Sequence, residues 1–348
     1  MMTVSVCIIA YNEEKVIDSI LDDIVNQTYD HGKMEVVLVN NDSTDATEQK
    51  MNAFAAQDHG FLRVTVEHND KKSQASGWNR AIMASNEEVI IRIDAHASVP
   101  PDFVEKNIEC QEQGEYVTGG PRPNILVGPT PWKQTLLLAE SSMFGSSIAG
   151  YRRDQGRKYV NSMFHAAYRR EVFDKAGLFN ENLGRTEDNE MHYRIRKAGY
   201  QLCFDPQIHS YQYVRSSFAK MLSQKFANGY WIGLTTGVCP QCLSLYHFVP
   251  FAFVLAIIIT TVLSVITAVF HAPAVLTTLV LGVTRLMWNA YWLLAVLMAA
   301  MSIATAKNEQ RNFSNILLPV LFFSLHVSYG IGTIKGLVKM PSFVKGIK

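Results

Sequence analysis

The first part of the chain alternates short apolar runs with segments of helical periodicity. We predict strands where β-branched and aliphatic residues form short runs bounded by turn-forming residues. These runs cover residues 3–10, 34–41, 62–68 and 88–94. Helices are predicted between them, over residues 13–28, 43–56 and 73–85. Strands that alternate with helices indicate an α/β domain with a mostly parallel, doubly wound sheet.

Long apolar runs replace this pattern after Tyr246, and nearly all the acidic residues lie before it. The runs cover residues 247–270, 274–305 and 313–334. A helix that crosses a membrane needs about 20 apolar residues, so the first and third runs fit one crossing each. The middle run is long for one crossing and short for two, and Arg285 and Asn289 interrupt it. We therefore predict a polar domain, a segment of interfacial helices or linker, and a transmembrane helical domain, at residues 1–214, 215–245 and 246–348.

Basic residues near the apolar runs bear on their orientation. Lys307 and Arg311 lie in the loop before the third run, and four lysines follow that run. By the positive-inside rule both regions look cytoplasmic, whereas three plain crossings from a cytosolic domain would put the C-terminus outside. Either one run is re-entrant or interfacial, or the middle run crosses twice. We predict a multi-pass protein of the cell membrane whose polar domain is cytoplasmic.

Charge and cysteine usage exclude some classes of protein. The net charge is +1 and no stripe of Lys and Arg is interleaved with aromatic residues, so we expect no nucleic-acid partner. The first residues carry neither a basic segment nor a cleavage site, so we expect the polar domain in the cytosol, where thiols stay reduced. Cys239 and Cys242 form a CxxC without a second pair at zinc spacing, and we interpret them as ordinary cysteines.

Polar side chains follow three of the predicted strands. Tyr-Asn-Glu-Glu comes after the first strand, Asn-Asn-Asp after the second, and Asp94 and His96 after the fourth. Ligands of open α/β sheets bind at the carboxyl ends of the strands, so these residues are expected to line one crevice. No GxGxxG follows the first strand, which disfavours a dinucleotide fold. The crevice offers amides that suit a nucleoside, and a carboxylate and an imidazole that suit a metal ion.

Six segments in this order identify a resemblance: "CIIAYNEE", "VLVNNDSTDAT", "QASGWNRAI", "RIDAHA", "AAYRREVFDKAGLFNENLGRTEDNEMHYRIRKAGY" and "QKFANGYW". Over residues 3–235 the chain resembles a family 2 glycosyltransferase with a nucleotide-sugar-binding GT-A fold. Within that family it looks most like the membrane-associated glucosyltransferases of succinoglycan-type exopolysaccharide assembly. The resemblance implies an inverting transfer from a UDP-sugar, with glucose as the expected sugar.

The resemblance implies a divalent metal at the end of the fourth strand. The family's DxD motif reads Asp94-Ala95-His96 here, and side chains two apart on an extended segment point the same way. Mg²⁺ prefers oxygen ligands and Mn²⁺ accepts imidazole more readily, so the histidine favours Mn²⁺ over Mg²⁺. The alternative is that Asp94 caps a turn and His96 only forms a local hydrogen bond. His209 occupies a place where related transferases carry a histidine near the metal or diphosphate, although a lone histidine is more often structural.

Family position also assigns residues that bind the nucleotide sugar. The strand ends and the "QASGWNRAI" segment supply Ala10, Tyr11, Glu13, Asn41, Gly77, Asn79 and Arg80, and Asp94 contacts the diphosphate through the metal. Asn40, Asn41 and Asp42 stand where a typical member has two acidic residues and a glycine, so uridine recognition is less specific, and turn formation is the alternative role. The "QKFANGYW" segment matches a family motif in part, with Gln224, Lys225 and Trp231 as candidate contacts but Tyr230 in place of the motif's arginine.

The resemblance places the general base in "GRTEDNEMHYRIRKAGY". Glu187 and Asp188 match the family's ED motif at the start of a predicted helix. In an inverting transfer a fixed carboxylate takes the proton of the attacking hydroxyl, and the resemblance gives that role to Asp188 with Glu187 beside it. The alternative is that both acids only complement the helix dipole.

Two acceptors fit an enzyme with a membrane domain. A saccharide linked to a polyprenyl diphosphate offers a hydroxyl and needs a base, whereas a polyprenyl phosphate is already ionised and needs none. The ED pair favours the first acceptor. A transporter or scaffold with a degenerate nucleotide-binding domain is a third possibility, and retention of Asp94, His96 and Asp188 argues against it.

Overall fold

A computed structural model describes residues 1–145, 156–214 and 217–347. The described residues divide into two compact units. Of the described residues, the first unit contains 1–125 and 156–213, and the second contains 126–145, 214 and 217–347. Residues 126–145 therefore pack with the C-terminal part of the chain.

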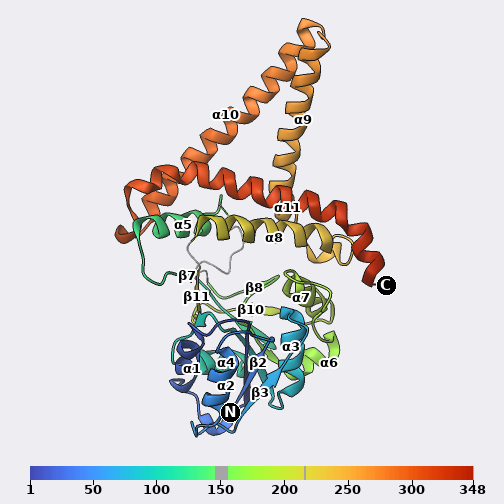
Figure 1. Ribbon diagram of the computed structural model, residues 1–348. Helices are drawn as coiled ribbons and strands as arrows, with labels where there is room; N and C mark the ends of the chain where they lie inside the picture. Colours follow the sequence, from blue (N-terminus) through green and yellow to red (C-terminus); the bar gives the residue numbers. More distant parts are fainter. Residues whose placement is uncertain (146–155, 215–216, 348) are drawn as a thin grey trace. The chain divides into compact units, whose positions relative to one another are not determined.

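The four strands expected from the sequence form one half of the main sheet of the first unit (Figure 1). They are β1 (Val4–Ala10), β2 (Met34–Asn40), β3 (Arg63–His68) and β4 (Val89–Asp94). They run parallel in the order β3-β2-β1-β4, which confirms the predicted doubly wound arrangement. Their carboxyl ends therefore lie along one edge of the sheet.

Shorter strands complete the sheet beyond β4. In the described residues the order continues β9-β6-β10-β8, and β9 (Ala167–Arg169) runs antiparallel to both β4 and β6 (Val117–Gly119). The other two are β10 (Leu202–Phe204) and β8 (Lys158–Val160). A separate small sheet has the order β5-β11-β7, with bounds Ala97–Ser98, Tyr211–Tyr213 and Asn124–Ile125. These short strands were not predicted, because two or three residues carry no readable alternation.

Helices cover both faces of the main sheet. They are α1 (Ile17–Val25), α2 (Thr47–Ala55), α3 (Gln74–Ala84), α4 (Phe103–Glu112), α6 (Arg170–Ala176) and α7 (Glu187–Lys197), with a 3₁₀ turn η1 (His31–Lys33). Helix α1 begins later than the predicted residue 13. The reason is that the backbone N–H groups of Glu13 and Glu14 donate to side chains of the next loop, Thr47 Oγ1 at 2.8 Å and Asp45 Oδ2 at 3.2 Å, which keeps this segment in a turn.

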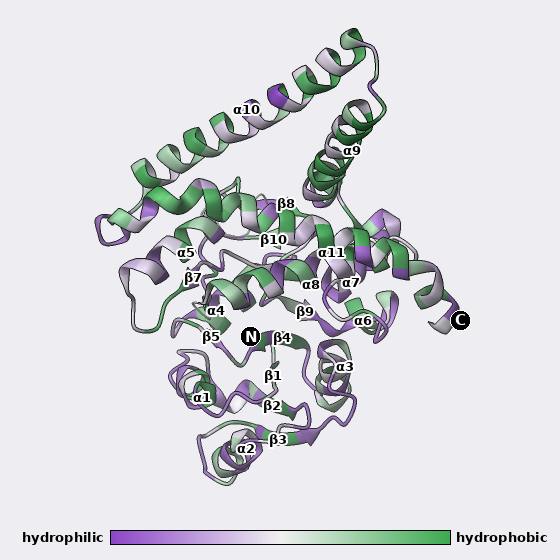
Figure 2. Cartoon of the chain, turned by 45° about the horizontal axis from the view of Figure 1, so that its top comes forward, coloured by the Kyte–Doolittle hydropathy of each residue, from purple (hydrophilic) through white to green (hydrophobic). Residues whose placement is uncertain are grey.

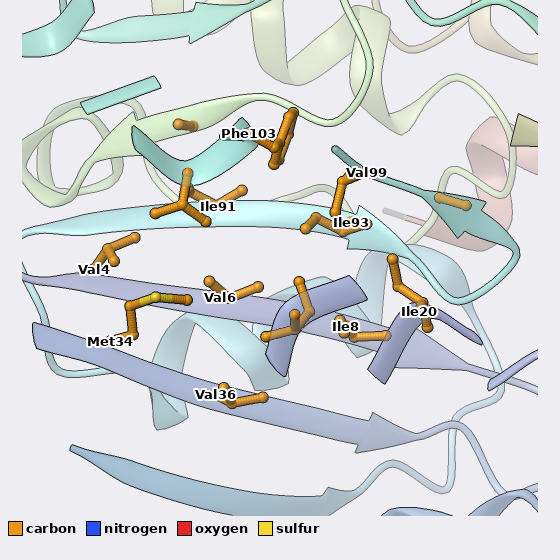
Figure 3. Packing of buried hydrophobic residues seen from close by; sticks show 14 of the residues in the cluster. Val4, Val6, Ile8, Ile20, Met34, Val36, Ile91, Ile93, Val99 and Phe103 are labelled. Atoms are coloured by element: carbon orange, nitrogen blue, oxygen red, sulfur yellow. The ribbon is translucent and has the colours of Figure 1, made fainter. Parts of the chain in front are cut away.

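Alternate residues of each central strand enter two cores. Along β1, Val4, Val6 and Ile8 pack with Ile20 and Phe103 in one cluster (Figure 3). The intervening Cys7 and Ile9 join Trp78 of α3 and Met191 of α7 in the other cluster. A strand buried on both faces reads as a continuous apolar run, which is why the sequence pattern located it well.

The second unit is helical. It contains α5 (Pro131–Ser141), α8 (Phe218–Thr235), α9 (Val249–Val269), α10 (Ala274–Thr305) and α11 (Leu318–Ile347), with 3₁₀ turns η3 (Pro240–Cys242), η4 (Leu245–Phe248), η5 (Asn308–Gln310) and η6 (Phe313–Leu317). Helices α8 and α11 lie side by side (Figure 1). A Cβ atom on Gly229 of α8 would lie 2.0 Å from the Tyr329 carbonyl oxygen, and one on Gly332 of α11 would lie 2.1 Å from that of Phe226. Glycine is therefore required where the two backbones meet.

The apolar helices differ in how much of their surface the protein covers. Among the described residues, Leu245–Val269, Ala274–Thr305 and Phe313–Ile347 are long and apolar enough to cross a membrane. Only 6% of the most apolar window of the first segment is buried, against 39% in the last. Figure 2 shows that α9 and α10 carry apolar residues around much of their surface. Helix α11 extends well beyond the predicted end at residue 334 and packs along α8.

Candidate active site

The loops at the carboxyl ends of the first strands are tied to one another. Asn12, Asp42 and Lys72 each adopt a left-handed backbone conformation, with φ of 55°, 57° and 53°. Asn12 accepts a hydrogen bond from the Thr44 N–H at 2.8 Å, and its own N–H donates to Ser43 Oγ at 3.0 Å. Lys72 pairs with Asp42 at 2.8 Å. Asn and Asp tolerate this conformation better than most residues, so the backbone of Asp42 suits turn formation, which was the alternative role for this residue.

Two residues predicted to bind the nucleoside lie next to each other. The Asn41 N–H donates to the Ala10 carbonyl oxygen at 2.9 Å, and Asn41 is buried. Its Oδ1 accepts from Asn69 Nδ2 at 2.6 Å. A Cβ atom on Gly77 would lie 2.6 Å from Asn41 Oδ1, so the glycine of α3 makes room for this amide. Tyr11, one residue after Ala10, is 47% exposed and accessible to a ligand.

The metal motif contacts a residue from the end of β1. His96 Nδ1 lies 3.4 Å from Glu13 Oε1, and His96 Nε2 lies 2.7 Å from Gln212 Nε2 on β11. The His96 carbonyl oxygen accepts from the Tyr213 N–H at 3.0 Å. The structure thus brings together Glu13 and His96, which the sequence assigned separately to nucleotide binding and to the metal.

Asp94 has a histidine partner that the sequence did not reveal. His165 Nε2 lies 3.3 Å from Asp94 Oδ2, and His165 Nδ1 lies 3.0 Å from Ser210 Oγ. Burial lowers the pKa of His165, so the neutral ring donates from Nε2 to Asp94 and accepts the Ser210 hydroxyl at Nδ1. Burial alone would raise the pKa of Asp94, but the hydrogen bond from His165 and the nearby positive charge of Arg122 hold it well below its usual range. His165 adopts a left-handed backbone conformation, with a φ of 47°. The sequence around it contains no pattern that predicts this conformation or the contact with Asp94.

The donor set at Asp94 fits a divalent cation only in part. No group of three His, Cys, Asp or Glu side chains is placed to hold a metal ion within the described ranges. Asp94 ends β4, whereas His96 lies in the turn that follows, so the motif is not the extended segment that we expected. The two residues nevertheless offer one carboxylate and one imidazole, and a diphosphate would bring further oxygen ligands. His209 lies between β10 and β11, next to Ser210, the partner of His165.

The ED pair opens helix α7, as expected, and Asp188 has a cationic partner. Arg92 Nη1 lies 2.7 Å from Asp188 Oδ1, and both side chains are largely buried. Glu187 is only 2% exposed, and its Oε2 has no hydrogen-bond partner within the described residues. Burial, and then the adjacent Asp188 carboxylate, raise the pKa of Glu187 to about 8. The two neighbouring acids therefore sit in different electrostatic environments, which is typical of functional sites.

Asn79 and Arg80, expected to contact the nucleotide, have partners within the protein. Asn79 Nδ2 donates to the Phe179 carbonyl oxygen at 2.9 Å, and Asn79 Oδ1 accepts from the Phe179 N–H at 2.8 Å. Arg80 pairs with Glu67 of β3 at 2.6 Å. The structure thus gives Asn79 a bridging role between α3 and the segment before α7, and Arg80 a partly exposed ion pair.

The candidates from "QKFANGYW" belong to the second unit. Gln224 is exposed on α8. Lys225 is 5% exposed, and its ammonium lies 3.2 Å from Glu140 Oε1 on α5. Trp231 contacts the Phe343 ring of α11, with centroids 6.0 Å apart. The charge of Lys225, a candidate donor contact, is thus compensated within its own unit.

Residues 5–177 match the family described as Glycosyl transferase family 2. Over 351 aligned residues, the chain is 25% identical to the dolichyl N-acetyl-alpha-D-glucosaminyl phosphate 3-beta-D-2,3-diacetamido-2,3-dideoxy-beta-D-glucuronosyltransferase of Methanococcus voltae, covering 98% of this chain and 99% of that protein. It is 28% identical to the succinoglycan biosynthesis protein ExoA of Rhizobium meliloti (strain 1021), covering 56% of this chain and 58% of that protein. These matches support the resemblance to family 2 glycosyltransferases.

A solved structure shows the same fold. The mannosyltransferase PcManGT from Pyrobaculum calidifontis, in complex with GDP-Man and Mn²⁺, matches with a TM-score of 0.56 and 17% identity. The match covers 97% of this chain and 87% of that protein. Together with the mostly parallel sheet, it confirms the predicted GT-A fold followed by apolar helices.

Proposed function

We propose that this family 2 glycosyltransferase moves a sugar, with inversion, from a UDP-sugar to a hydroxyl of a saccharide carried on a polyprenyl diphosphate. Glucose is the proposed sugar, and exopolysaccharide or capsule assembly the proposed process. The observation that carries the proposal is the buried carboxylate of Asp188, paired with Arg92 on the strand that ends at Asp94. Strand β4 therefore contains Asp94, the proposed metal ligand at the donor, and Arg92, which pairs with Asp188, the proposed base at the acceptor.

The relatives support a lipid-linked acceptor. The name of the Methanococcus voltae protein describes transfer to a sugar on dolichyl phosphate, and the match extends over nearly the full length of both chains. The Rhizobium meliloti relative takes part in succinoglycan biosynthesis. Apolar helices long enough to cross a membrane, found in the described residues, suit an acceptor whose lipid is held in a bilayer.

The chemistry follows from a carboxylate placed beside the attacking hydroxyl. The acceptor oxygen forms a bond with the anomeric carbon while its proton passes to Asp188. The bond between the anomeric carbon and the phosphate oxygen breaks, and UDP leaves with the electron pair. Asp94 and His96 are the residues that would hold Mn²⁺ or Mg²⁺, and such a cation would neutralise charge on the departing diphosphate.

The alternative acceptor is a polyprenyl phosphate. Its oxygen is already ionised, so the reaction would need no general base. A buried carboxylate that is held by a buried arginine would then have no proton to accept. Asp188 and its partner Arg92 therefore favour the hydroxyl acceptor.

For the membrane part, we place α9 and α10 across the bilayer and α11 in the interface. Helices α9 and α10 have little of their apolar surface covered, and α11 packs along α8. Lys335, Lys339 and Lys345 are exposed on α11 beside the exposed Val338, which is the pattern of a helix lying at an anionic membrane surface. Two crossings return the chain to its starting side, so the lysines after α10 and on α11 are cytoplasmic, in agreement with the positive-inside rule.

The test is a donor and acceptor screen with the full chain in detergent. UDP release is measured with UDP-glucose, UDP-galactose and UDP-N-acetylglucosamine, each with a polyprenyl-diphosphate-linked saccharide, with a polyprenyl phosphate, and without acceptor. We expect the saccharide to stimulate release with UDP-glucose and to gain the mass of one hexose. Stimulation by the polyprenyl phosphate alone would replace this proposal with the alternative acceptor.

A further inference from the structure

Arg92 is a buried cation on a central strand. It lies on β4, two residues before Asp94, and is 6% exposed. Residues two apart on a strand share a face, so Arg92 and Asp94 point to the side of the sheet that also carries Ile90 and Trp78. Arginine is rarely buried at such a position without a specific partner.

Two aromatic rings flank the guanidinium group. Its Cζ atom lies 4.3 Å from the centroid of Trp78 and 4.5 Å from that of Phe179. Asn79 fixes the second ring by bonding both the N–H and the carbonyl oxygen of Phe179. A planar guanidinium stacks on such rings in a way that an ammonium group cannot, so the orientation of the Arg92 donors is fixed.

The fixed donor faces Asp188. Nη1 of Arg92 lies 2.7 Å from Asp188 Oδ1, between residues 96 positions apart in the chain. A charge-assisted hydrogen bond with both partners buried is short and directional. It holds the carboxylate in one orientation at the first turn of α7.

Helix α7 has other anchors. One turn after Asp188, His192 Nε2 lies 2.8 Å from the Tyr168 hydroxyl, and His192 Nδ1 lies 3.0 Å from Ser162 Oγ. Arg194 pairs with Glu190 at 2.7 Å and donates to the Leu178 carbonyl oxygen at 2.7 Å. The contact with Tyr168 attaches the helix to strand β9, and the contact with Leu178 attaches it to the segment after α6, both without Arg92. The ion pair with Asp188 is therefore not needed merely to hold the helix.

We propose that Arg92 is a positioning residue for the transfer reaction. Its stacked guanidinium orients the Asp188 carboxylate toward the acceptor and stabilises its negative charge. The inference rests on the proposed function, because it takes Asp188 as the general base. Arg92 thus connects two parts of the proposed site: it lies two residues before Asp94, the proposed metal ligand, and it binds Asp188, the proposed base.

The test compares Arg92→Met, Arg92→Lys, Asp188→Asn and the double variant Arg92→Met/Asp188→Asn. Two reactions are followed in the full-length enzyme: transfer to the lipid-linked saccharide, and hydrolysis of UDP-glucose by water. We expect Arg92→Met to lower kcat about 100-fold, the usual cost of misplacing a catalytic group, with little change in KM for UDP-glucose.

Arg92→Lys keeps the charge without the planar stack. Its kcat should lie between those of wild type and Arg92→Met, with KM for UDP-glucose unchanged. The double variant should be no slower than Asp188→Asn, since residues that act as a unit are not additive. Phe179→Leu, which removes one face of the stack, should give a smaller loss of kcat and provides a second variant if Arg92→Met does not fold.

Arg194→Lys is the matched control. It weakens another arginine–carboxylate pair on the same helix, so it should lower the unfolding temperature but leave kcat and KM unchanged. A folded Arg92→Met enzyme with wild-type kcat would overturn the inference. So would a double variant that is slower than Asp188→Asn by the full factor of Arg92→Met. If the wild-type enzyme hydrolyses UDP-glucose but transfers nothing to a lipid-linked saccharide, the proposed acceptor is wrong. The effect of each Arg92 variant on the rate of hydrolysis then tests the role of Arg92.

Discussion

The His165 imidazole donates from Nε2 to Oδ2 of Asp94 across 3.3 Å, and this pair stands at the centre of the candidate donor site. His165 lies just before β9, and Asp94 ends β4, and these two strands pair antiparallel. The histidine side chain is 3% exposed, so it reaches Asp94 from inside the protein. A group that fixes the orientation of a metal-binding carboxylate affects both metal affinity and donor binding.

His165→Ala is expected to weaken activation by Mn²⁺ by about 10–100-fold, because Asp94 loses the group that orients it. The measurement is UDP release as a function of Mn²⁺ concentration. His59→Ala serves as the control, since His59 bonds the Phe54 carbonyl oxygen far along the chain from these residues. Equal Mn²⁺ activation of wild type and His165→Ala would show that the contact does not support the site.

Activity is expected to depend on a divalent cation, with Mn²⁺ at least as effective as Mg²⁺. His96→Asp should remain partly active and shift its preference toward Mg²⁺, because an oxygen ligand replaces nitrogen. Rates with each cation after chelation and readdition test both statements. Full activity in excess chelator would contradict metal dependence.

Asp188→Asn and Asp94→Asn are expected to separate chemistry from donor binding. Asp188→Asn keeps the size of the side chain but cannot accept a proton, so transfer should fall by about 10²–10⁴-fold with little change in donor affinity. Asp94→Asn should weaken donor binding as well. Calorimetry with UDP-glucose and turnover on the lipid-linked saccharide give the two quantities. An Asp188→Asn enzyme with normal turnover would point to the polyprenyl phosphate acceptor.

Glu187→Gln is expected to raise the unfolding temperature near pH 8 and to have little effect near pH 4. The pKa of Glu187 is raised from 4.5 to about 8 in the folded chain, so the folded state binds this proton more tightly than the unfolded state does. The contribution of Glu187 to stability is therefore complete below about pH 4.5 and is lost as the pH rises toward 8. Glutamine stays neutral and avoids that loss. Thermal unfolding of both proteins from pH 4 to pH 8 measures the difference, and a gain that does not vary with pH would contradict it.

Gly332→Val is expected to disrupt the packing of α8 against α11. The new Cβ would meet the Phe226 carbonyl oxygen at 2.1 Å, and overpacking of this kind usually costs about 1–3 kcal/mol or more. Gly282→Val on α10 is the matched control, because a Cβ there meets nothing within 4 Å. Thermal unfolding in detergent compares the two. Equal unfolding temperatures of the two variants would mean that α8 and α11 can move apart at little cost in stability.

The pattern of apolar and polar residues was enough to locate the strands and helices in which buried positions recur at a regular spacing. The strands β1, β2 and β4 are apolar runs because helices cover both faces of the sheet there, whereas the edge strand β3 is only partly buried. The sequence located the ends of all four strands to within about a residue. The helix that carries Glu187 and Asp188 was located from the signals at its two ends. Acidic residues mark its start, and Gly199, with a φ of 95°, follows its end. The Asp94-Ala95-His96 motif follows directly from the end of a predicted strand.

Tertiary structure alone decided the partners of those residues. Arg92 and Asp188 are 96 positions apart, and Asp94 and His165 are 71 positions apart. The first pair meets because α7 packs on the face of the sheet that carries Arg92, and the second because a three-residue strand, β9, lies beside β4 in the antiparallel sense. A short strand has too few residues for a periodic signal, and its direction depends on the topology of the whole sheet.

The same limit applies to the helices of the second unit. The apolar runs predicted helices, but hydropathy does not distinguish a surface covered by lipid from one covered by another helix. Glycines at 229 and 332 let α8 and α11 approach closely, and α5 joins them from the middle of the chain. Apolar character is a property of each residue and can be read from the sequence, whereas the choice of covering surface is a property of pairs of segments and is fixed only when the chain folds.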